Sequence, residues 1–175
     1  MVRNGLLFLI AVVGGPLASG STAAKYDVRL ISLSPPRLSV TATVPVAGDA
    51  IEMSTSRPGD VARLGQEGWP ALVRNLRVED EHGQTLALTS AGPKGWRLAA
   101  PHTGHLRVRY EVDYAILAEG NWPAQREAAF ADDGHLVVVG RSLFITTPTT
   151  TVSMITIPVN AVAIALRASQ LIRAA

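Results

Sequence analysis

The 175-residue chain contains no cysteine, which excludes both a disulfide framework and a thiolate metal site. Aromatic residues make up only 5% of the sequence and charged residues only 17%. The sequence pI is near 9.4, but the formal net charge is only +2 and the arginines are spread along the chain. Nucleic-acid-binding proteins usually carry a basic run or stripe, so this composition predicts no nucleic-acid partner.

The sequence also lacks an apolar run of the roughly 20 residues that a membrane-spanning helix needs. The shorter run Leu6–Val13 follows Arg3 and precedes small residues that continue to Ala24. This order is typical of a secretory signal peptide. The sequence therefore predicts a signal peptide over residues 1–24 and an exported protein, periplasmic or secreted, without a stable membrane anchor after cleavage. The alternatives are an uncleaved anchor or a buried first strand.

Alternation of apolar and polar residues dominates the chain from Tyr26 onward. It is clearest in Leu38–Val44 and His105–Tyr114, where every second residue is apolar. A period of two places these residues on one face of a sheet whose other face is solvated. Weaker strands are expected at Asp27–Ser32, Ala50–Ser54, Arg74–Asp80, Thr85–Thr89, Gly95–Leu98, Leu136–Val139, Leu143–Thr146 and Val152–Ile157.

Turn-forming residues separate these segments. They are Pro35-Pro36, Gly48-Asp49, His82-Gly83, Gly92–Gly95 and Pro101–Gly104. The rhythm of short strands and turns predicts an all-β fold, an antiparallel β-sandwich over residues 25–157. Asp60–Leu72 interrupts this rhythm as a loop or a short helix. Residues 158–175 form a poorly patterned tail, within which Ala161–Ala175 is either a short C-terminal helix or loosely packed.

Histidine is the residue type most often found in metal and catalytic sites, and the chain has four. His102 and His105 form an HxxH spacing, but zinc normally takes three or four protein ligands. Pro101 and Gly104 also argue against a helix that would present both imidazoles together. His82 and His135 each neighbour a glycine, and the four are interpreted as solvated turn residues.

Acidic and aromatic residues supply the other candidates. Glu79-Asp80-Glu81 and Asp132-Asp133-Gly134 could bind calcium weakly through carboxylates, but neither has the alternating ligands of an EF-hand loop. Both are interpreted as solvated turns. Trp69, Trp96 and Trp122 either cap the ends of a β core or form an exposed binding surface, and capping is favoured.

Recognisable catalytic motifs are missing from the sequence. There is no HExxH zinc motif, no GxSxG nucleophile elbow and no phosphate-binding glycine loop. No serine stands at a familiar spacing from a histidine and an acid. The sequence therefore predicts no catalytic, cofactor-binding or metal-binding residue and no cofactor.

Several of these segments, taken in order, resemble the N-terminal β-domain of the M61 (glycyl aminopeptidase) family of metallopeptidases. The matching segments are Tyr26-Asp27-Val28, Leu38–Val44, Arg57–Asp60, Val73–Asp80 with Gly83, Gly95–Leu98, Leu106–Tyr114 and Gly140–Ile145. The resemblance covers residues 26–157. The family's usual Trp before Pro-Gly is replaced by Ser56-Arg57. The catalytic domain with its HExxH would lie beyond residue 175, so no family catalytic residue can be assigned here.

Three functional hypotheses follow. The resemblance implies a non-catalytic domain that packs on a peptidase catalytic domain, either from a truncated peptidase or as a stand-alone relative. The strand pattern and the predicted export also fit an independent module that binds another exported protein or a peptide through an edge strand. A stand-alone enzyme with an unrecognised site is the least favoured.

Overall fold

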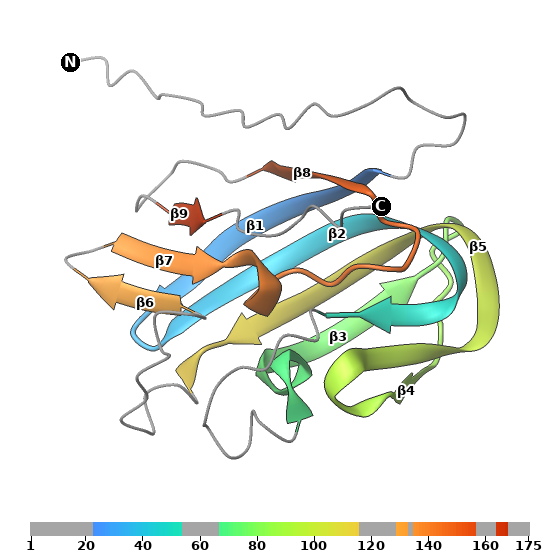
Figure 1. The fold of residues 1–175 in the computed structure, drawn as a ribbon, viewed down its shortest axis with the longest axis horizontal. Helices are drawn as coiled ribbons and strands as arrows, with labels where there is room; N and C mark the ends of the chain where they lie inside the picture. Colours follow the sequence, from blue (N-terminus) through green and yellow to red (C-terminus); the bar gives the residue numbers. More distant parts are fainter. Residues whose placement is uncertain (1–22, 54–66, 116–128, 133–134, 157–163, 168–175) are drawn as a thin grey trace.

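The computed structural model describes residues 23–53, 67–115, 129–132, 135–156 and 164–167 (Figure 1). These residues form two β-sheets and short 3₁₀ turns. The strands are β1 (Ala23–Leu33), β2 (Pro36–Glu52), β3 (Val73–Glu79), β4 (Leu88–Ser90), β5 (Gly95–Asp113), β6 (Ala129–Asp132), β7 (His135–Val139), β8 (Val152–Thr156) and β9 (Ile164–Arg167). The 3₁₀ turns are η1 (Trp69–Leu72), η2 (Gly92–Lys94) and η5 (Gly140–Ser142).

The larger sheet is six-stranded, in the order β3-β5-β2-β1-β8 with β4 pairing β5, and the smaller has the order β6-β7-β9. The prediction of a mainly β protein is confirmed, and most strand pairs are antiparallel as expected, but two pairs depart from the antiparallel arrangement. β8 runs parallel to β1, and β9 runs parallel to β7. Alternation along a strand specifies which face is buried but not the direction of the neighbouring strand.

Two long strands, β2 and β5, form the centre of the large sheet (Figure 1). Four predicted strands merge into these two, and the predicted turns at Gly48-Asp49 and Pro101–Gly104 are wrong because both lie inside the strands. Pairing of Gly48 with His102 is followed directly by pairing of Ala50 with Arg97. The turn-forming residues therefore form an irregularity within one long antiparallel strand pair instead of reversing the chain.

The core lies on the face of the large sheet that the alternating residues predicted. Val40, Val108 and Val112 are fully buried there, as is Trp69 of η1. The opposite face carries the residues between these apolar ones. Lys25, for example, lies beside Thr43 of β2, which in turn lies beside Arg107 of β5. Of the described large apolar side chains, only Ile31 and Met154 are exposed.

The predicted strand Leu143–Thr146 is not a strand in the structure. After η5 the chain runs irregularly across the core, and only Thr146 forms an isolated bridge, with Glu52. Two hydrogen bonds join the backbones of these residues. The segment Thr146–Thr150 continues along β2, where the hydroxyls of Thr147 and Thr149 donate to the carbonyl of Pro45. Here side-chain hydroxyls, and not the backbone of a neighbouring strand, donate the hydrogen bonds that this carbonyl accepts.

Three tyrosines hold this irregular segment in place. The hydroxyl of Tyr26 donates to the carbonyl of Ile145 at 2.6 Å, and that of Tyr110 donates to the carbonyl of Leu143 at 2.8 Å. The Tyr110 oxygen also accepts the backbone N–H of Ile145 at 3.2 Å. Tyr114 lies within 3.2 Å of the Ser142 hydroxyl. Buried backbone groups that lack strand partners therefore find theirs on side chains.

This arrangement predicts unfolding at alkaline pH. Burial raises the pKa of Tyr110 and Tyr114 above the ordinary value of 10.0. A raised pKa in the folded state gives stability that is complete below pH about 10 and declines as pH rises further. We expect phenolate absorbance to appear together with loss of the β-sheet circular dichroism signal. Titration near pH 10 with an intact sheet signal would contradict this packing.

Other predictions fall partly or wholly outside the described residues. The predicted signal peptide, residues 1–24, lies outside the described residues except for Ala23 and Ala24, which belong to β1. Of the expected loop or helix Asp60–Leu72, the described part contains η1. In the tail, Ile164–Arg167 is strand β9, so a helix is wrong at these four residues. The turns at His82-Gly83 and Gly92–Gly95 are confirmed.

Candidate functional site

The acidic turn and one histidine singled out in the sequence come together at one corner of the large sheet. The turn follows β3, and His105 lies on β5 beside the bulge. One carboxylate oxygen of Glu81 accepts the backbone N–H of His105 at 2.9 Å and lies 3.9 Å from its Nδ1. Gly104 permits this approach, since a Cβ there would lie 2.5 Å from the same oxygen. The carboxylate therefore joins the turn to β5.

The neighbouring carboxylate shapes the turn itself. Asp80 Oδ1 accepts the backbone N–H groups of His82 and Gln84, at 2.9 and 2.8 Å. Such side-chain bonds to the following backbone are the usual way in which aspartate stabilises a turn. Asp80 thus acts as the structural turn residue that the sequence predicted, with one oxygen used by its own backbone.

A small open hollow lies at this corner. Thr43, Asp80, Glu81, Gly83, His105, Leu106 and Arg107 line it, and its volume is about 160 Å³. Ligand sites for drug-sized molecules usually measure about 300–1,000 Å³. Within the described ranges, no group of three or more His, Cys, Asp or Glu side chains is arranged to hold a metal ion. The hollow therefore offers a few polar groups of the turn and of β5.

Beside this corner, Glu79 is a buried acid held between two arginines. Its side chain is 8% exposed and lies 3.0 Å from Arg77 Nε and 3.3 Å from Arg109 Nη1. The two arginines face each other across β3 and β5, and the shared carboxylate offsets their repulsion. This cluster stabilises the pairing of β3 with β5 and leaves no uncompensated buried charge.

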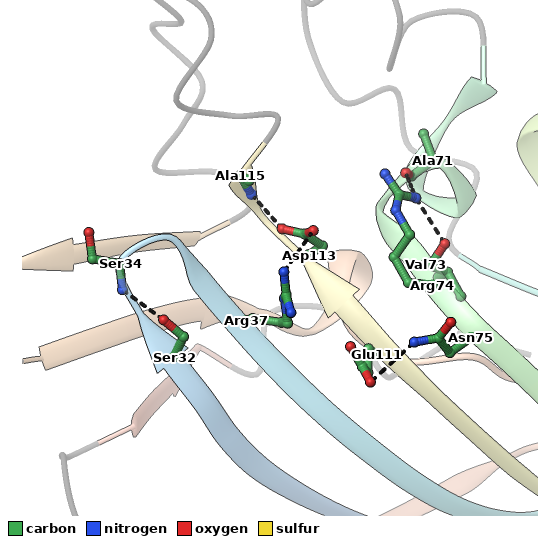
Figure 2. Close-up of polar contacts among 10 residues, drawn as sticks. All are labelled: Ser32, Ser34, Arg37, Ala71, Val73, Arg74, Asn75, Glu111, Asp113 and Ala115. Atoms are coloured by element: carbon green, nitrogen blue, oxygen red, sulfur yellow. Dashed lines mark hydrogen bonds and ion pairs between the residues drawn. The ribbon is translucent and has the colours of Figure 1, made fainter.

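A second polar cluster lies where β5 ends (Figure 2). Asp113 accepts the backbone N–H of Ala115 at 3.0 Å and lies 3.6 Å from Arg37 of β2. Nearby, Asn75 has a positive φ of 55° at a bulge of β3, and its amide donates to Glu111 at 3.2 Å. Asparagine is among the residues that adopt this conformation most readily. These contacts hold backbone geometry at the end of the sheet.

The same cluster closes part of the outer edge of β3. Arg74 donates to the carbonyls of Ala71 and Val73 at 2.7 and 3.0 Å (Figure 2). The bulge at Asn75 twists the strand, and Leu86 donates back to Val78 further along. Bulges and charged side chains are common protections of an edge strand. Strand addition at β3 is therefore disfavoured.

The structure describes the remaining sequence candidates only in part. Trp69 is fully buried, and Trp96 is partly buried against the core, as expected for capping residues. Trp122 and the pair Asp133-Gly134 lie outside the described residues. The side chains of Asp132 and His135 are likewise not described, although their backbones pair between β6 and β7. His102 lies on β5 opposite Gly48.

The sequence reasoning missed the tyrosines as a group. Tyr26 comes from β1, while Tyr110 and Tyr114 come from β5, and all three converge on residues 142–145. The positions of Tyr110 and Tyr114 on the apolar face were predicted, whereas no face was predicted for Tyr26. A tyrosine on an apolar face carries a buried hydroxyl, and a buried hydroxyl needs a hydrogen-bond partner. This requirement could have predicted that the tyrosines bind polar groups of another segment.

The family to which the chain belongs follows from its sequence. The sequence profile of the Peptidase M61 N-terminal domain matches residues 25–174. The chain belongs to this family. The resemblance found in the sequence is thus confirmed, and the M61 N-terminal domain accounts for both described sheets. In its described residues, no helix is long and apolar enough to cross a bilayer.

A solved structure with the same fold extends this finding. It is the crystal structure of an aminopeptidase N family protein from Idiomarina loihiensis, with a TM-score of 0.55 and 18% sequence identity. The match covers 78% of this chain and 22% of that chain. The present chain therefore matches less than a quarter of the length of that solved protein. No curated protein matches the chain.

Proposed function

We propose that this M61 N-terminal domain is a non-catalytic, exported β-sandwich that packs on a peptidase catalytic domain and helps to shape its substrate cleft. The observation that carries the proposal is the family match over residues 25–174. The solved relative supports it, because there the same fold makes up only 22% of a longer aminopeptidase N family chain.

The polar corner supports a non-catalytic role. Asp80 and Glu81 are bonded to backbone N–H groups of their own turn and of β5. General acid–base catalysis is favoured in a site that excludes water. The hollow between them is open and small. We therefore assign these residues to the structure of the turn.

The sandwich arrangement is part of the proposal. Val138 of β7 belongs to the same buried cluster as Val40 of β2, together with Leu143, Phe144 and Ile145. A shared core between the two sheets is what a sandwich requires.

Association with a catalytic domain is the main test. The probe is the catalytic domain of an M61 peptidase from which its own N-terminal domain has been removed. We expect residues 25–175 to form a one-to-one complex with it in analytical ultracentrifugation, with a Kd of about 10 μM or tighter, and to raise its melting temperature. The folded variant Gly48→Ala should bind equally well. Absence of a complex at 100 μM of each partner would overturn the proposal.

Export is tested separately with a reporter fusion. In this fusion, residues 1–24 are joined to the N-terminus of alkaline phosphatase, an enzyme that is active only outside the reducing cytoplasm. The charged start and apolar run of this segment should direct export and give active phosphatase. A matched fusion with Leu9→Arg and Val12→Arg should lose the activity, because charges in the apolar run oppose membrane insertion. Equal activity of both fusions, or none from either, would contradict export.

The second function, an independent peptide-binding module, is favoured by one feature. β8 is at the end of the large sheet and pairs only with β1 among the described strands. An extended peptide could add to such an edge. Failure of the catalytic-domain test, combined with specific capture of an exported protein that a Met154→Lys variant no longer retains, would favour this function instead.

A further inference from the structure

No further inference is drawn: the strongest candidate, the charged solvent-facing surface of the six-stranded sheet around Lys25, Arg107 and Arg109, carries nothing because acids of the same surface already pair with most of its arginines and nothing in the described part of the structure shows what covers it.

Discussion

Replacing Gly95 with alanine is expected to prevent stable folding. Gly95 begins β5 with φ of 131°, a conformation that residues with a Cβ rarely adopt. An added Cβ would lie 2.4 Å from the carbonyl oxygen of Ile51 and 3.1 Å from the Cα of Glu52. Both neighbours are backbone atoms of the paired strand β2, so neither can rotate away. The paired strands β2 and β5 would have to separate at this point.

The expected effect of Gly95→Ala combines two terms. Backbone strain in this region costs about 1–3 kcal/mol, and forced overlap in a packed site adds about 1–3 kcal/mol. Their sum, about 2–6 kcal/mol, is a large part of the roughly 5–15 kcal/mol by which natural domains are stable, and equals the whole stability of the least stable ones. Urea denaturation followed by circular dichroism measures the loss. The variant should be unfolded, or should have a midpoint far below that of the natural chain.

Gly48→Ala is the matched control for this experiment. Gly48 has a nearly identical φ of 126°, but a Cβ there meets nothing within 4 Å. It should therefore show the strain alone, about 1–3 kcal/mol. If the two variants were equally stable, close approach of the strands at Gly95 would be refuted, whereas strain at both sites would stand.

Replacing Tyr110 with phenylalanine has the second-largest expected effect. The ring would still fill its place in the core, but the carbonyl of Leu143 and the N–H of Ile145 would both lose their partner. Each buried group left unsatisfied costs about 1–3 kcal/mol. We expect a loss of about 2–4 kcal/mol in the free energy of unfolding, measured by urea denaturation.

Tyr114→Phe is the comparison for Tyr110→Phe. The Tyr114 hydroxyl is 3.4 Å from the Ser142 carbonyl and 3.2 Å from the Ser142 hydroxyl, so its bonds are longer. Ser142 keeps a 2.8 Å bond from its hydroxyl to the Val139 carbonyl when Tyr114 is changed. A loss of about 1 kcal/mol is expected. A Tyr110→Phe variant as stable as the natural chain would show that residues 143–145 do not depend on the Tyr110 hydroxyl.

Much of the β-structure could be predicted from local pattern. Alternation identified the buried faces of β2 and β5, and the buried residues Leu38, Val108 and Val112 are among those it selected. The turn at Asp80–Gly83 was also readable, because aspartate and glycine stabilise a reversal through contacts made within a few residues. The family resemblance rested on this order of segments.

The candidate site was less predictable, because its contacts join distant residues. Glu81 and His105 are 24 positions apart, and their contact follows from the pairing of β3 with β5, in which Glu79 lies opposite Arg107. Gly48-Asp49 and Pro101–Gly104 looked like chain reversals because glycine and proline favour turns and bulges alike. Whether such residues form a turn or a bulge depends on whether the residues after them can pair with a neighbouring strand.

The sequence by itself determined that the chain is mainly β, which side chains of its central strands are buried, and the family to which it belongs, since each rests on residue type and spacing. Only the tertiary structure decided the parallel pairing of β8 and β9, the merging of predicted strands into β2 and β5, and the irregular path of residues 143–145. The physical reason is that backbone hydrogen bonds must be completed by whatever lies nearby. For Leu143 and Ile145 the nearby partners are tyrosines of distant strands.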